Sequence, residues 1–167
     1  MVEVRRLGAA DAPAYREVRL AALRADPAAF ITTAEEYAAQ TPETIAARLT
    51  GEDSVTFGAF VDGELVGILT ASRETRERLL HRANVFGVAV LPAARGQGCG
   101  DALLRAGIAC VEGWGGVTAL HLGVTVSQAA ARRLYERQGF VAWGVQPDAV
   151  RVDGVTLAEV HMVREMS

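Results

Sequence analysis

The chain has 167 residues, with 20 acidic and 17 basic side chains, a net charge of −3 and a pI of about 5.6. This length predicts one domain, residues 1–167, with room for a real core. The acidic balance argues against a nucleic-acid partner, which usually requires a basic patch. No apolar run approaches the roughly 18 residues of a membrane span, so no membrane partner is expected.

The cysteines and the N-terminus point to one compartment. The two cysteines have no metal-ligand spacing and imply no disulfide framework, so neither a metal nor an oxidising environment is expected. The first residues, MVEVRRLGAAD, carry charges and lack the apolar region of a signal peptide. We therefore expect a cytoplasmic protein.

The first third of the chain predicts one strand followed by helices. Residues 2–7 alternate apolar and charged side chains, which is typical of a half-buried strand. A helix is expected over 11–26, where an aspartate can cap its start and Asp-Pro ends it. Thr33 and Glu36 have the spacing of a capping box, which predicts a short helix. Residues 41–49 predict another helical segment.

Two segments of the chain predict β-hairpins. Residues 54–71 and 140–162 each contain two apolar runs separated by an Asp-Gly pair, which begins at Asp62 and at Asp153. Both central residues of a type I′ turn need positive φ, and Asp-Gly supplies such residues.

Two buried strands lie between the hairpins, and a helix follows each of them. Residues 85–91 are apolar and rich in β-branched side chains, and residues 117–126 are similar. Apolar residues from Leu104 to Val111 have helical spacing, and the second helix ends at Gly139. The order predicts a mixed α+β sheet rather than a strict βαβ alternation or an all-β sandwich.

A glycine-rich loop joins the strand over 85–91 to its helix, with the sequence PAARGQGCG. The first N–H groups of a helix have no partner within it, and the helix dipole is positive at that end. Glycines leave these donors open to an anion, and Arg95 adds a fixed positive charge. A phosphate or pyrophosphate is the natural guest of such a loop.

Several kinds of phosphate loop compete for this stretch. A P-loop is excluded because the chain contains no lysine, and Asp101 stands where a dinucleotide fingerprint needs its third glycine. The pattern R-x-x-G-x-G fits as Arg95, Gly98 and Gly100. Here the sequence resembles the GNAT superfamily of acyl-coenzyme A-dependent N-acetyltransferases. On this hexapeptide alone, a turn that only joins a strand to a helix remains an alternative.

A second motif supports the resemblance. Residues 128–140 read QAAARRLYERQGF, which is similar to the closing GNAT motif N-x-x-A-x-x-L-Y-E-x-x-G-F. The resemblance implies the GNAT fold, a central, mostly antiparallel sheet of about seven strands flanked by about four helices. It also implies an acyltransferase that uses acetyl-CoA as co-substrate. A homodimer is common in the family.

The resemblance also implies a set of cofactor-binding residues. The backbone of one strand is expected to pair with the pantetheine arm, and the loop N–H groups to hold the pyrophosphate. The residues implied are Val88, Ala89, Val90, Arg95, Gly96, Gln97, Gly98, Cys99, Gly100, Gln128, Ala131 and Tyr135. Gln128 departs from the family's asparagine, and either contacts the cofactor or only caps the helix.

Tyr135 is the candidate general acid for the leaving thiolate, because a phenol stays protonated at neutral pH. For the general base, Glu35 and Glu36 lie in the segment that borders the acceptor groove in this fold, and Glu159 on the last strand is another group able to meet substrate. Ribosomal-protein alanine acetyltransferases place a catalytic glutamate at the position of Gly123, which cannot accept a proton.

The function expected is direct transfer of an acetyl group from acetyl-CoA to a primary amine of a small-molecule or amino-acid-like acceptor. An acidic chain favours a cationic acceptor. Two alternatives stay open. One is a protein or peptide N-terminal or lysine acetyltransferase, and the other is a non-catalytic acyl-CoA-binding module.

Overall fold

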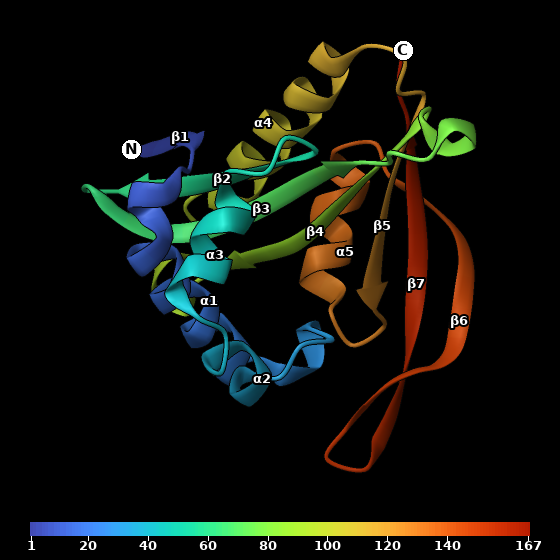
Figure 1. The fold of residues 1–167 in the computed structure, drawn as a ribbon. Coiled ribbons are helices and arrows are strands. Elements are labelled where there is room, and N and C mark those ends of the chain that lie inside the picture. The colour runs from blue at the N-terminus through green and yellow to red at the C-terminus, as the bar shows by residue number, and fades with distance from the viewer.

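A single seven-stranded sheet forms the centre of the molecule, and five α-helices pack on it (Figure 1). The computed structural model describes all residues, 1–167. The strands are β1 (Val2–Arg6), β2 (Ser54–Val61), β3 (Glu64–Arg73), β4 (Arg82–Val90), β5 (Ala119–Thr125), β6 (Val141–Val152) and β7 (Val155–Glu165). The helices are α1 (Ala12–Ala25), α2 (Ala34–Ala38), α3 (Pro42–Leu49), α4 (Cys99–Trp114) and α5 (Ala129–Arg137). The predicted α+β fold class is confirmed.

The strands follow the order β1-β2-β3-β4-β5-β7-β6, and only β4 and β5 run parallel. That parallel pair is short, because Arg82–Asn84 pair with Ala119–His121 and no further. Beyond this point the two strands diverge, and α5 lies across the opening between them (Figure 1). The split divides the sheet into a four-stranded part and a three-stranded part.

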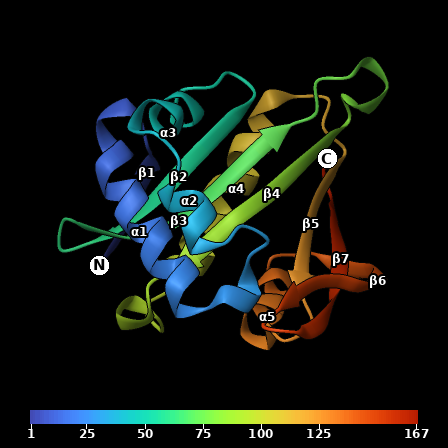
Figure 2. The same cartoon turned by 60° about the horizontal axis from the view of Figure 1, so that its bottom comes forward.

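The two faces of the sheet carry separate cores. Helices α1, α2 and α3 cover one face, and α4 lies on the opposite face (Figure 2). A core of 12 buried residues, including Leu23 and Ile45, lies under the first group of helices. A core of 19, including Leu103 and Met162, lies on the α4 side. No helix is long and apolar enough to span a membrane.

Several local predictions are confirmed. Both Asp-Gly turns have two residues of positive φ, 51° and 80° at Asp62 and Gly63, and 49° and 79° at Asp153 and Gly154. The predicted capping box forms at the start of α2. The cap predicted for α1 is wrong in detail. The carboxylate of Asp11 accepts the Gly8 N–H at 2.8 Å instead, so it stabilises the turn that leads into the helix.

A β-bulge in β4 has no clear signal in the sequence. Thr70 of β3 pairs with Phe86, and Ile68 pairs with Ala89, so two residues of β4 stand opposite Leu69 alone. Gly87 adopts φ of +63° in this bulge. Such a bulge bends a strand and increases its local twist. It lies just past the three residues that pair with β5, where the two strands diverge.

Candidate functional site

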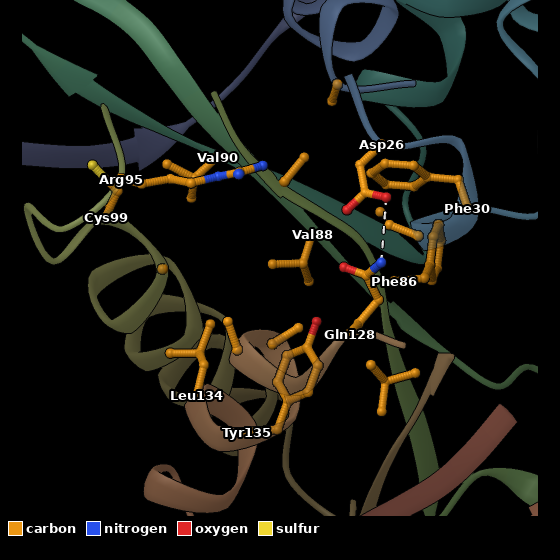
Figure 3. A pocket seen from close by; sticks show the side chains of 18 of the residues that line it. Asp26, Phe30, Phe86, Val88, Val90, Arg95, Cys99, Gln128, Leu134 and Tyr135 are labelled. Atoms are coloured by element: carbon orange, nitrogen blue, oxygen red, sulfur yellow. Dashed lines mark hydrogen bonds between the residues drawn. The ribbon is translucent and has the colours of Figure 1, made fainter. Parts of the chain in front are cut away.

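A cavity of about 670 Å³ occupies the gap between β4 and β5 (Figure 3). Strand β4 forms one wall, and α5 forms the wall opposite. The glycine-rich loop closes one end, and the segment after α1 closes the other. The cavity is within the usual range of small-molecule sites.

The wall formed by β4 offers main-chain groups. The Leu91 N–H donates to the Val66 carbonyl of β3 at 2.9 Å. Successive N–H groups of an extended strand alternate in direction, so the Val90 N–H points away from β3 into the gap. Because β5 has diverged here, it supplies no partner for this edge. An extended ligand is therefore able to pair with β4 as an added strand does.

The end of the cavity formed by the glycine-rich loop has a geometry that suits an anion. Gly96 and Gly98 have φ of +79° and +84°, and α4 begins at the next residue, so its first N–H groups are open. Arg95 is exposed, forms no ion pair within the protein, and extends toward Val90 (Figure 3). A Cβ atom at Gly100 would lie 2.9 Å from Leu134 Cδ2, so this glycine allows α4 and α5 to approach closely.

Tyr135 projects from α5 into the middle of the cavity (Figure 3). The residue is only 7% exposed, and burial raises the pKa of its phenol to about 12. Its ring packs edge-on against Phe140 with 6.1 Å between centroids. The end of α5 is tied to α4, since the Asp101 carboxylate accepts from Arg137 Nη2 and from Gln138 Nε2, both at 3.1 Å. Packing thus positions the ring, and the raised pKa keeps the phenol protonated at neutral pH.

The other end of the cavity is closed by two hydrogen bonds between distant parts of the chain. Gln128 Nε2 donates to Asp26 Oδ1 at 3.3 Å, and Thr125 Oγ1 donates to the Ala28 carbonyl at 2.8 Å. Gln128 makes no side-chain cap for α5, although it is the N-cap residue. Gln128 instead lines the cavity, and its amide connects the start of α5 to the end of α1.

A carboxylate occupies the place that Gly123 leaves empty. The side chain of Glu159, from the neighbouring strand β7, lies directly over Gly123, where any Cβ atom would collide with it. Glu159 lines the cavity, and its side chain is 17% exposed. His161 Nε2 lies 3.5 Å from Glu159 Oε1 and 3.1 Å from Gln146 Oε1.

The structure gathers most of the cofactor residues that the sequence predicts around this one cavity. Gln97 alone of the twelve does not line it. Cys99 is buried with its Sγ toward the Ala94 carbonyl, and burial raises the pKa of its thiol, so it contributes its backbone rather than a nucleophile.

Glu35 and Glu36, predicted as candidates for the base, lie outside the cavity. Both are exposed on α2. The Glu36 carboxylate accepts the Thr33 N–H at 3.2 Å, where it completes the capping box. Neither carboxylate lines this cavity or the smaller one beside it.

Three carboxylates line the larger cavity, those of Asp26, Asp101 and Glu159. Asp26 accepts from Gln128, and Asp101 accepts from Arg137 and Gln138. Of the carboxylates that the sequence offered as candidates, only Glu159 lines the cavity.

The smaller cavity, about 300 Å³, lies between α1, α2, α3 and the sheet. It meets the larger one at shared lining residues, Arg19, Thr32, Phe86 and Gly87. No motif in the sequence predicts this second cavity. The available signal was Arg19 itself, because Tyr15, Arg19 and Ala22 follow helical spacing along a largely buried stripe of α1.

Comparisons with known proteins agree with this geometry. The family model "Acetyltransferase (GNAT) family" matches residues 18–140. An L-amino acid N-acetyltransferase, AaaT of Escherichia coli, is 31% identical over 106 residues, which are 64% of this chain and 65% of that protein. The chain therefore spans a little under two thirds of this relative's length.

Two solved structures share the fold. A GNAT-family acetyltransferase from Streptococcus pneumoniae superposes with a TM-score of 0.86 at 22% identity, covering 100% of both chains. The yncA protein of Salmonella typhimurium, solved with its cofactor acetyl-CoA, superposes with a TM-score of 0.84 at 21% identity. The match covers 99% of this chain and 94% of that chain. The family match spans more than half of the chain, from α1 to the end of α5. The chain belongs to the acetyltransferase (GNAT) family.

Proposed function

We propose that this protein is an N-acetyltransferase that moves an acetyl group from acetyl-CoA to the primary amine of a small, amino-acid-like acceptor. One observation carries the proposal. A single cavity combines a free strand edge, a glycine loop at a helix N-terminus and a buried, protonated phenol. The name of the Escherichia coli relative and the acetyl-CoA bound to yncA support the same activity.

The residues present fit acetyl-CoA as the occupant. The pantetheine arm carries amide groups that suit the open main-chain edge of β4 from Val88 to Val90. The pyrophosphate suits the N–H groups at the start of α4, with Arg95 as the counter-charge. Tyr135 then stands at the middle of the cavity, where the thioester end of an extended molecule is expected.

The reaction that we propose is direct transfer. The acceptor nitrogen forms a bond to the acetyl carbon, the carbon–sulfur bond breaks, and the sulfur leaves with its electron pair. The Val90 N–H is the donor that we propose for the developing oxyanion. Tyr135 donates its proton toward the leaving sulfur, and a carboxylate accepts the proton that the amine loses.

We assign the base to Glu159. It lines the cavity from β7, whereas Glu35 and Glu36 lie outside. Its position over Gly123 places a carboxylate beside the strand position at which ribosomal-protein alanine acetyltransferases carry their glutamate. The carboxylate is thus supplied by the next strand of the sheet.

The test is thiol release from acetyl-CoA with a panel of amines, amino acids, polyamines and peptides. We expect turnover with small amino acids, and a loss of about 10²- to 10⁴-fold in kcat for Tyr135→Phe. The Kd for acetyl-CoA, measured by calorimetry, should remain within about twofold because the ring is retained. Since the pKa of Tyr135 is about 12, this group causes no fall in wild-type rate up to about pH 10. Tight binding without thiol release from any acceptor would indicate a binding module instead.

A further inference from the structure

We propose that the smaller cavity binds the carboxylate of the acceptor, with Arg19 as its principal ligand. The proposal rests on the function proposed above, and it adds which group of the acceptor is recognised and by which residues. It follows from charge, from unpartnered polar atoms, and from how the two cavities meet.

The guanidinium of Arg19 is held in place without an acidic partner. It lies over the rings of Phe30 and Tyr37, with its Cζ 5.3 Å and 5.7 Å from their centroids. Its Nη1 is buried and has no hydrogen-bond partner within the protein. A buried donor left unpaired is costly to a folded protein, and a carboxylate is one of the two common anionic groups, with phosphate, that can pair with both arms of an arginine fork.

The rest of the lining has the same character. Arg48 brings a second positive charge, and no aspartate or glutamate lines the cavity. The Tyr37 hydroxyl is buried and unpartnered, and it can donate to a carboxylate. Oε1 of Gln40 is also unpartnered, but it is an acceptor and adds nothing to an anion site. Burial raises the pKa of both phenols, to about 12 for Tyr37, so Tyr15 and Tyr37 stay protonated and able to donate. Donors and positive charge without a counter-ion select an anion.

The position of Arg19 connects this site to the chemistry. Arg19 lines both cavities, and its Nη1 lies against the bulge of β4, 3.2 Å from where a Cβ atom at Gly87 would stand. In an α-amino acid the nitrogen is separated from the carboxylate by one carbon atom. A carboxylate on Arg19 therefore holds its amine at the junction beside Phe86 and Gly87, facing the larger cavity. An acceptor with only positive charge, such as a polyamine, is repelled from the same place.

The experiment compares matched acceptors. Each L-amino acid of a panel is assayed beside the amine that lacks only its carboxyl group, for example leucine beside isopentylamine. We expect the best amino acid to exceed its amine by at least about 10²-fold in kcat/KM. In Arg19→Gln this preference should disappear, because kcat/KM falls for the amino acid and stays nearly constant for the amine. Arg24→Gln, an exposed arginine of the same helix, is the matched control and should leave the preference intact.

Two further measurements keep the test decisive. The Kd for acetyl-CoA should be nearly unchanged in Arg19→Gln, and Arg48→Gln should give a smaller loss of the same preference. If no acceptor causes thiol release from acetyl-CoA, the proposed function fails. The anion site can still be tested by calorimetry, in which the CoA-bound protein is titrated with carboxylates that lack the amino group, such as 4-methylpentanoate. Binding that is lost in Arg19→Gln supports the site. Equal turnover of amino acids and amines, or binding of none of the carboxylates, overturns it.

Discussion

The two adjoining cavities are built from different parts of the polypeptide. The larger one offers main-chain groups to the pantetheine arm and pyrophosphate of the proposed co-substrate, namely the edge of β4 and the first N–H groups of α4. The smaller one presents side chains from separate elements, Tyr15 and Arg19 of α1, Tyr37 of α2 and Arg48 of α3. Main-chain groups suit a ligand that stays the same, whereas side chains are changed by single substitutions. We therefore associate the first with the co-substrate and the second with acceptor choice.

The largest effect is expected from removing the carboxylate that we propose as the base. We expect Glu159→Gln to lower kcat by about 10²-fold, because the variant keeps the size of the side chain and loses its ability to accept a proton. The KM for the amino acid should change little, in contrast to Arg19→Gln. Steady-state kinetics with the best acceptor measures both parameters. If Glu159→Gln raised KM and left kcat unchanged, Glu159 would contribute to substrate binding rather than to proton transfer.

His161→Gln is the control for that variant. It retains a polar side chain beside Glu159 and Gln146 but removes the imidazole. We expect a loss of less than about tenfold in kcat, since this residue acts on the carboxylate rather than on the acceptor.

A smaller effect is expected from the loop backbone. Alanine at the φ of +84° held by Gly98 is strained by about 1–2 kcal/mol. Gly98→Ala should therefore weaken acetyl-CoA binding by about tenfold and leave the preference for a carboxylate unchanged. Calorimetry with acetyl-CoA measures the first effect, and the matched-acceptor assay measures the second.

The matched glycine is Gly113, in the last turn of α4. It has no positive φ, and a Cβ atom there would meet nothing within 4 Å. Gly113→Ala should leave acetyl-CoA binding unchanged and raise stability by up to about 1 kcal/mol, because alanine is the better helix former. If Gly98→Ala and Gly113→Ala weakened acetyl-CoA binding equally, the loop conformation would not be the cause of the weaker binding.

The smallest effect is expected from removing the hydrogen bond between Gln128 and Asp26, which closes one end of the larger cavity. Gln128→Ala removes the hydrogen bond to Asp26, and one such bond contributes about 1 kcal/mol. We expect the melting temperature to fall by about 2–4 °C, and kcat/KM for all acceptors to fall together by a few-fold. A selective loss for amino acids would place Gln128 in acceptor recognition.

The difference between local patterns and long-range contacts explains how much of the fold and of the site could be predicted from the sequence. The turns, the capping box, the strands and the glycine loop depend on residues that are close together in the chain. Asp62-Gly63 therefore predicted a hairpin turn, and Thr33-x-x-Glu36 predicted a capping box. The bulge at Gly87 depends on how β4 pairs with β3, and the position of Glu159 over Gly123 depends on the register of β5 and β7. The smaller cavity requires three helices to meet. No local pattern contains that information, and only a charge on the buried stripe of α1 pointed to it.

The divergence of β4 and β5 has a consequence for solubility. An open strand edge normally invites pairing with other chains, and proteins usually cover it or place charges on it. Here the free edge of β4 lies inside a cavity between α5 and the segment after α1, and the bonds of Thr125 and Gln128 close one end. The protein thus keeps its pairing groups available to a slender ligand while shielding them from the strands of neighbouring molecules.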